Sequence, residues 1–185
     1  MTGSAEEPTE LVGQDGAAIP DRLARLWTPH RMAYIKAEAE VDRDEGGCPF
    51  CRIPDLTDED GLVVRRGENV FAVLNLHPYN PGHLMVVPYR HVGPLEDLTQ
   101  DEAVELTVLT QQALRTIRSV SRPHGFNVGL NLGGVAGGSL AAHLHQHVVP
   151  RWSGDANFIA VISHTKIIPQ LLGDTRALLA DAWQA

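Results

Sequence analysis

The sequence predicts an α+β protein built on an antiparallel sheet. Segments with the apolar pattern of strands outnumber those with the pattern of helices, and several connections between strands are short enough for hairpins. With 185 residues, of which 43% are hydrophobic, the chain suits one globular domain with a sizeable core. No internal repeat is visible.

The N-terminal part is expected to hold a tail and a helix. Residues 1–18 are small, acidic and glycine- and proline-bearing, which is typical of a disordered tail, so we expect a single domain over residues 19–185. Asp21 is a candidate cap for a helix that Pro29 interrupts. Its apolar positions are Leu23, Leu26, Trp27, Met32 and Ile35. We expect this helix to pack on the core, with a substrate lid or a subunit interface as alternatives.

Three strands are expected in the first half of the chain. Residues 61–65 and 70–76 are apolar runs joined by a turn at 66–69. Residues 83–88 form the third strand, after a turn-rich loop at 77–82.

A long helix is expected after Thr99. Thr99 and Glu102 have the spacing of a capping box, and Pro123 and Gly125 are typical of a helix end. The apolar positions recur every three or four residues: Val104, Leu106, Leu109, Ala113, Ile117 and Val120.

The last third of the chain is expected to add strands and a final helix. Residues 126–131 and 157–163 have the pattern of strands, and Pro169 opens the helix. The apolar positions of that helix are Leu171, Leu172, Leu178, Leu179 and Trp183.

Three histidines stand at every second position of residues 142–150. This alternation predicts a strand with His143, His145 and His147 on one face, roughly 7 Å apart, and Gln146 on the other. Neutral imidazole is a nucleophile, a proton carrier and a metal ligand near pH 7. The row therefore indicates chemistry, with chance surface clustering as the alternative.

A glycine-rich loop at residues 131–140 precedes the histidines. Such a loop lets backbone amides converge on an anion, and Ser139 adds a hydroxyl. Together with the histidine row it favours attack on phosphorus. A flexible linker is the alternative interpretation.

The composition excludes several other classes. A formal charge of -8 argues against broad nucleic-acid binding. No apolar run is long enough to span a membrane, and the acidic N-terminus is unlike a signal peptide, so we expect a cytoplasmic protein.

Cys48 and Cys51 form a C-x-x-C pair, which is half a zinc site or a redox pair. A redox motif requires a following helix, whereas Pro54 interrupts one here. The zinc interpretation needs two further ligands, which histidines could supply. Two free buried thiols are the alternative.

Residues 143–150 resemble the signature of the histidine triad (HIT) superfamily of nucleotide hydrolases and transferases. The resemblance extends to Asn75, to residues 81–88 and to Asn131, and covers roughly residues 45–152. Within the superfamily, the likeness is strongest to actinobacterial diadenosine tetraphosphate (Ap4A) phosphorylases. It is carried there by residues 26–29, 121–127 and 150–158. The resemblance implies a HIT-like fold, with about five antiparallel strands, packed helices and N- and C-terminal helical extensions.

The resemblance also implies the chemistry. His145 would attack the α-phosphorus of a dinucleoside polyphosphate and form a covalent nucleotidyl-histidine. His147 would bond a phosphate oxygen or the leaving group. Asn131, Gly138 and Ser139 would hold the α-phosphate oxygens.

The remaining substrate contacts are less specific. The resemblance places Asn75 on the ribose hydroxyls, and turn stabilisation is the alternative for both Asn75 and Asn131. We expect the base pocket near Phe71, Val73 and Leu74. Trp27, Trp152 and Phe158 are candidates for stacking on a second nucleoside or for the core.

The resemblance implies a structural zinc ion on Cys48, Cys51, His91 and His143. Such a Cys₂His₂ set is closed and tetrahedral, so it would orient the neighbouring His145 and leave no open position for catalysis.

Two features depart from the usual triad. Gln146 stands where an apolar residue is common, and the segment 139–143 is one residue longer than in the common hydrolases. The longer segment is consistent with a reshaped acceptor site. The basic candidates for the acceptor phosphate, each with solvated surface as the alternative, are Arg122, Arg151 and Lys166.

The favoured function is therefore a phosphorylase that converts Ap4A and inorganic phosphate into ATP and ADP. The first alternative is a hydrolase of dinucleoside polyphosphates or nucleoside phosphoramidates, in which water is the acceptor. The second is a non-catalytic, zinc-stabilised nucleotide-binding protein. A homodimer or higher homo-oligomer is expected from the resemblance.

Overall fold

The computed structural model describes residues 47–137, 140–155 and 170–183. The expected tail, the N-terminal helix, the strand at 157–163, Gly138 and Ser139 lie outside these residues. The described elements are α2 (Pro49–Arg52), η1 (Ile53–Asp55), β1 (Val63–Arg66), β2 (Val70–Leu74), β3 (Leu84–Pro88), η2 (Leu95–Asp97), α3 (Gln100–Ser121), β4 (Gly125–Leu130), η3 (Gly134–Ala136), β5 (Gln146–Arg151) and α5 (Leu172–Asp181).

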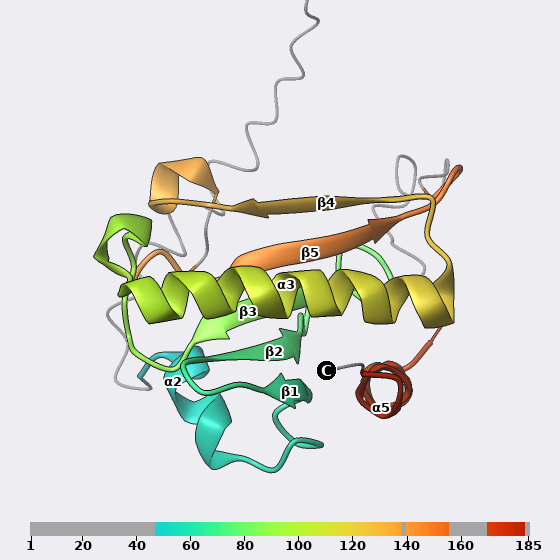
Figure 1. Cartoon of the computed structure of the whole chain (residues 1–185), viewed down its shortest axis with the longest axis horizontal. Helices are drawn as coiled ribbons and strands as arrows, with labels where there is room; N and C mark the ends of the chain where they lie inside the picture. The colour runs from blue at the N-terminus through green and yellow to red at the C-terminus, as the bar shows by residue number, and fades with distance from the viewer. Residues whose placement is uncertain (1–46, 138–139, 156–169, 184–185) are drawn as a thin grey trace, which may run out of the picture.

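Five antiparallel strands form one sheet in the order β1-β2-β3-β5-β4, which confirms the predicted α+β class. Figure 1 shows α3 lying across one face of the sheet, with α5 beside its β1 edge. Every residue of β2 and β3 is buried, because these central strands are covered on both faces. Val70 and Ala72 pack toward α3, and Phe71 and Val73 pack on the opposite side with Phe50 of α2.

α3 begins as the sequence predicts. The Thr99 hydroxyl accepts the Glu102 backbone N–H, and the Glu102 carboxylate accepts the Thr99 backbone N–H, so both arms of the capping box are formed. Four of the predicted apolar positions are buried against the sheet: Leu106, Leu109, Ala113 and Ile117. The prediction was wrong for Val104, which is 56% exposed because it faces away from the sheet.

α5 contacts β1 and the core through a narrow stripe. Leu179 is only 1% exposed and packs with Ile117 and Val64 in one core cluster. The indole of Trp183 donates to Gln112 of α3. Leu171 and Leu178 are exposed, so the predicted apolar side was too wide. Within the residues that the structure describes, no helix has the length and apolar character needed to cross a bilayer.

Candidate active site

A cavity of about 580 Å³ opens on the face of the sheet opposite α3. His145 and His147 line it, together with Asn75 and Asn131. Most of its remaining wall is apolar and comes from α2, the segment after it, the end of β2 and the start of β3: Phe50, Ile53, Leu62, Val73, Leu74 and Met85. An apolar cavity with a few convergent polar groups is typical of a small-molecule site.

The three histidines do not form the single row that their spacing predicts. β5 begins at Gln146, so His143 and His145 stand in the loop before the strand. The rings of His145 and His147 lie 5.0 Å apart, edge to face. His143 lies instead beside His91, with the two rings 5.1 Å apart. The triad is therefore divided between two sites.

His145 has a defined neutral tautomer. Its Nδ1 lies 2.8 Å from the carbonyl oxygen of His143, which can only accept, so Nδ1 carries the proton and Nε2 carries a lone pair. The side chain is 6% exposed, and burial lowers its pKa despite the opposing effect of this hydrogen bond. Near pH 7 the ring is a neutral nucleophile on the cavity wall.

His147 has the opposite tautomer because of His83. The Nδ1 atom of His83 accepts the Tyr79 backbone N–H at 3.0 Å, so the proton of His83 is on Nε2. This Nε2–H donates to Nδ1 of His147 at 2.9 Å. The proton of neutral His147 is therefore on Nε2. Burial, assisted by the nearby His145, lowers the pKa of His147 to about 4.

The sequence interpretation missed His83. It placed this residue only in a predicted strand, although Gly82-His83 belongs to the segment that carries the resemblance. His83 is fully buried and polar, and a buried imidazole needs partners on both nitrogens. Those partners lie 64 residues downstream and in the preceding turn, so local sequence could not identify them.

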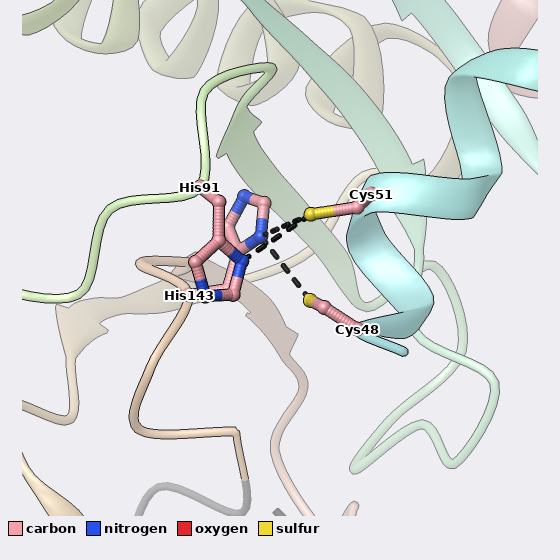
Figure 2. A group of neighbouring side chains, drawn as sticks. All are labelled: Cys48, Cys51, His91 and His143. Carbon is pink, nitrogen blue, oxygen red and sulfur yellow. Dashed lines mark hydrogen bonds between the residues drawn. The ribbon is translucent and has the colours of Figure 1, made fainter. Parts of the chain in front are cut away.

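Figure 2 shows a second cluster formed by Cys48, Cys51, His91 and His143. The Nδ1 atom of His143 lies 3.3 Å from Sγ of Cys48 and 3.5 Å from Sγ of Cys51. Nδ1 of His91 lies 3.3 Å from Sγ of Cys51. Neighbouring sulfur and nitrogen ligands of a tetrahedral zinc ion are roughly 3.6 Å apart, so the cluster has the donors and the size for such an ion.

The tautomer of His143 suits metal binding. Its Nε2 donates to the Pro88 carbonyl oxygen at 2.9 Å, which leaves the Nδ1 lone pair directed at the cysteines. Burial lowers the pKa of His143, with smaller lowering contributions from His91 and His145. The four residues of the cluster come from the start of α2, the loop after β3 and the loop before β5.

Two residues predicted to contact the substrate, Asn75 and Asn131, line the cavity, and Asn75 already forms hydrogen bonds within the protein. Asn75 follows β2, and its side-chain oxygen accepts the His77 backbone N–H at 2.9 Å. Its amide nitrogen lies 3.4 Å from Nδ1 of His83. Asn75 thus stabilises the turn that holds His83, and its exposure to the cavity leaves it within reach of a ligand.

The aromatic and basic candidates lie elsewhere. The indole of Trp152 donates to the Ser121 carbonyl at the end of α3. Arg151 pairs with Asp155, and Arg122 is the exposed cap of α3, so neither lines the cavity. Phe71 packs on Tyr89 and does not line the cavity, whereas Val73 and Leu74 do. Trp27, Phe158 and Lys166 lie outside the described residues.

Gln146 points away from the cavity, as its place in the alternation predicts. Its amide donates to the Thr110 hydroxyl of α3 at 2.7 Å. The hydroxyl in turn donates to the Leu106 carbonyl. Gln146, which departs from the usual triad pattern, therefore links β5 to α3 through a hydrogen bond.

The fold and the divided triad define a nucleotide-processing class of protein, and the comparison with known families agrees. The HIT domain family matches residues 57–154, and the chain belongs to this family. It is also 61% identical to the AP-4-A phosphorylase of Mycobacterium tuberculosis over 97% of both chains.

Solved structures are similar in fold. A zinc-bound histidine triad family protein from Mycobacterium smegmatis has a TM-score of 0.58 and 27% identity, and the similarity covers 74% of this chain and 92% of that one. A uridylyltransferase has a TM-score of 0.65 at 19% identity, covering 85% of this chain and 51% of that one, which is a likeness of fold alone.

Proposed function

We propose that the protein is an Ap4A phosphorylase that converts Ap4A and inorganic phosphate into ATP and ADP. The observation that carries this proposal is the buried, neutral His145, with its proton held on Nδ1 and its Nε2 lone pair at the cavity. The 61% identity to an AP-4-A phosphorylase along nearly the whole chain supports the choice of substrate and acceptor.

The first step is a displacement at the α-phosphorus. Nε2 of His145 forms a bond to this phosphorus, and the bond to the bridging oxygen of the triphosphate breaks, so ATP leaves and AMP stays on the enzyme. His147 presents Nε2–H, which donates to the departing oxygen. The tautomer imposed by His83 makes this donation available while the ring remains neutral.

The second step returns the enzyme to its starting state. An oxygen of inorganic phosphate attacks the α-phosphorus, and the bond to Nε2 of His145 breaks, which releases ADP. Water in place of phosphate would release AMP. The acceptor thus separates a phosphorylase from a hydrolase that shares the same covalent intermediate.

The family resemblance supports the remaining substrate contacts, and the cavity wall supports those of Asn75 and Asn131. We assign the α-phosphate to Asn131, Gly138 and Ser139, and the ribose to Asn75. The base occupies the apolar part of the cavity near Val73 and Leu74, whose aliphatic side chains favour a flat, apolar ring over a charged group.

Product analysis with Ap4A, with and without inorganic phosphate, tests the function. We expect ATP and ADP only when phosphate is present, and a loss of at least about 10³-fold for His145→Ala with folding retained. His124→Ala is the matched control, since His124 is exposed and its ring only accepts the Ser153 backbone N–H, outside the cavity. ATP and AMP formed without phosphate would indicate the hydrolase, and absence of all products would favour a nucleotide-binding protein without turnover.

We also propose that Cys48, Cys51, His91 and His143 hold a structural zinc ion. The mixed sulfur and nitrogen donor set supports zinc over harder cations, and the solved relative from M. smegmatis is described as zinc-bound. Four protein ligands leave no open position, so the ion supplies cross-linking and orientation. Zinc-binding cysteines of this kind fit the reducing cytoplasm that the sequence favours.

We propose that the protein forms a homodimer or a higher homo-oligomer. β4 is an edge strand of the sheet, and Val128 on it is exposed. Val135 in the following turn is 98% exposed. A sheet edge that pairs with no other strand among the described residues, and that carries apolar side chains, favours pairing with a second copy. Sedimentation velocity would show the assembly as a mass that is a multiple of the chain's.

A further inference from the structure

One wall of the cavity is the segment that precedes the first strand of the sheet. Residues 53–62, here called the wall segment, connect α2 to β1, and Ile53, Leu56, Asp60, Gly61 and Leu62 line the cavity. Inside the segment, the Thr57 hydroxyl accepts the Asp60 backbone N–H and donates to the Asp60 carboxylate. Backbone turns hold the segment internally, and the Leu62 carbonyl accepts the Leu74 N–H of β2. Two arginine side chains from outside the segment hold the rest of it.

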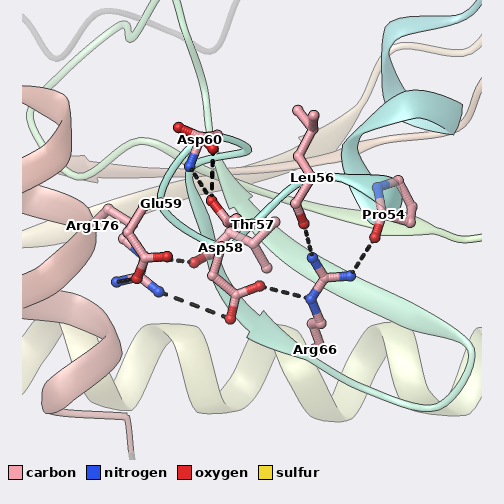
Figure 3. Close-up of polar contacts among 9 residues, drawn as sticks. Pro54, Leu56, Thr57, Asp58, Glu59, Asp60, Arg66 and Arg176 are labelled. Carbon is pink, nitrogen blue, oxygen red and sulfur yellow. Dashed lines mark hydrogen bonds and ion pairs between the residues drawn. The ribbon is translucent and has the colours of Figure 1, made fainter.

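Arg66 of β1 holds the segment from one side. Its Nε lies 2.7 Å from the Asp58 carboxylate, and its two terminal nitrogens donate to the carbonyls of Pro54 and Leu56 at 3.0 Å each. Figure 3 shows this guanidinium bridging two turns of the segment.

Arg176 of α5 holds the segment from the other side (Figure 3). Its Nη1 lies 3.0 Å from the Glu59 carboxylate and its Nη2 lies 3.8 Å from the Asp58 carboxylate. Its Nε donates to the Val63 carbonyl at 2.9 Å. The Arg176 side chain is only 15% exposed, whereas Glu59 is 72% and Asp58 41% exposed. Solvent therefore screens the two ion pairs in part, and the hydrogen bond to the Val63 carbonyl is the more sheltered contact.

The contacts of Arg176 flank a strained residue that faces the cavity. Leu62 has φ +55°, a left-handed conformation that is unfavourable for a residue with a branched side chain. Such a residue persists when its surroundings fix it from both sides. Arg176 binds Asp58 and Glu59 before Leu62 and Val63 after it.

The helix that carries Arg176, α5, is anchored in the core and lies outside the residues that match the HIT domain. Leu179 anchors the helix in the core, three residues after Arg176. The HIT domain match ends at residue 154, before α5 begins at Leu172. The support that Arg176 gives to the wall is thus an addition to the shared domain.

We propose that Arg176 is a positioning residue that sets the shape of the nucleotide cavity from the C-terminal helix. Its guanidinium fixes the wall segment, and through it the place of Leu62 beside the bound base. The inference rests on the proposed function for the identity of the ligand. Arg176 touches neither the triad nor the cavity, so it acts on binding of the nucleoside and leaves the displacement at phosphorus unchanged.

Steady-state kinetics of Arg176→Met tests the inference. Methionine keeps the aliphatic length and removes the charge and every donor. We expect the KM for Ap4A and the Kd for ADP by calorimetry to rise about tenfold, with kcat within about threefold of wild type. Arg176→Lys should recover only part of the loss, since one ammonium cannot reach all three partners. Arg115→Met, on the exposed side of α3, is the matched control and should change nothing.

A double variant separates positioning from general destabilisation. Asp58→Asn removes a carboxylate that Arg176 and Arg66 share, so Arg176→Met and Asp58→Asn combined should raise KM by less than the product of the two single effects. Unchanged KM and ADP affinity in folded Arg176→Met, or a fall in kcat alone, would overturn the inference and leave the proposed function intact. Wild-type protein that neither cleaves Ap4A nor binds ADP would overturn both.

Discussion

Two histidines of the site have opposite tautomers, and each is imposed by a single acceptor or donor. The His143 carbonyl fixes the proton of His145 on Nδ1. His83, oriented by the Tyr79 backbone N–H, fixes the proton of His147 on Nε2. A nucleophile with a lone pair and a neighbouring N–H donor therefore coexist as neutral rings, as displacement at phosphorus requires.

His83→Ala should lower kcat by about 10- to 100-fold and change KM for Ap4A little. Without the His83 donor, His147 can rotate or take the other tautomer, so donation to the leaving oxygen is lost for much of the time. Tyr79→Phe is the matched control, because it keeps the backbone N–H that orients His83 and an aromatic ring beside it. A His83→Ala enzyme with wild-type kcat and unchanged zinc content would contradict the assignment.

At the scale of elements, the start of α3 was predictable and the start of β5 was not. The capping box depends only on Thr99 and Glu102, which are three residues apart, and both of its hydrogen bonds are present in the structure. The alternation of the histidines predicted a strand from residue 142, yet the chain before Gln146 is held by contacts with a distant loop. The Leu144 N–H donates to the Val92 carbonyl, and a Cβ on Gly93 would lie 2.8 Å from the Ala141 oxygen. Contacts with such distant residues do not alter the alternation of apolar and polar residues, so the alternation could not predict where β5 begins.

The turn between β1 and β2 shows the same dependence on a distant side chain. The Glu105 carboxylate of α3 accepts the backbone N–H groups of Glu68 and Asn69 at 2.7 and 2.6 Å, and the Asn69 amide at 2.9 Å. Burial alone would raise the pKa of Glu105, but these hydrogen bonds outweigh it and lower the pKa. α3 therefore completes the turn at the edge of the sheet.

Glu105→Gln should lower the free energy of unfolding by about 1–3 kcal/mol at pH 7, because one acceptor oxygen becomes an amide that faces backbone donors. A carboxyl with a lowered pKa stabilises the fold above its unfolded pKa, and this contribution is lost as the pH falls through the folded value. The difference from wild type should therefore shrink below about pH 4. Urea unfolding at pH 7 and 3.5 measures it, with the exposed Glu96→Gln as control. Equal stability of Glu105→Gln and wild type at pH 7 would refute this account of the turn.

At the scale of the whole molecule, the cysteine and histidine cluster joins segments that the sheet alone leaves separate. Cys48 is the N-cap of α2 and Cys51 lies within this helix, which forms part of the cavity wall. His143 stands two residues before the nucleophile. The sequence indicated all four residues, because a C-x-x-C pair and a family resemblance specify residue types and positions. It could not show that His143 turns away from His145, since that depends on the Pro88 carbonyl 55 residues upstream.

Removal of zinc should therefore affect both stability and catalysis. We expect about one zinc per chain in protein purified without chelators, and chelation or His91→Ala should lower the thermal midpoint and reduce kcat at least about tenfold. The reason is that α2 and the loop before β5 lose their cross-link, so Phe50 and His145, whose rings lie 5.1 Å apart, lose their fixed spacing. Added zinc should restore chelated wild type more completely than His91→Ala, whereas the exposed His124→Ala should retain its metal. Metal analysis far below one zinc per chain, with full activity, would show that the cluster is held by hydrogen bonds alone.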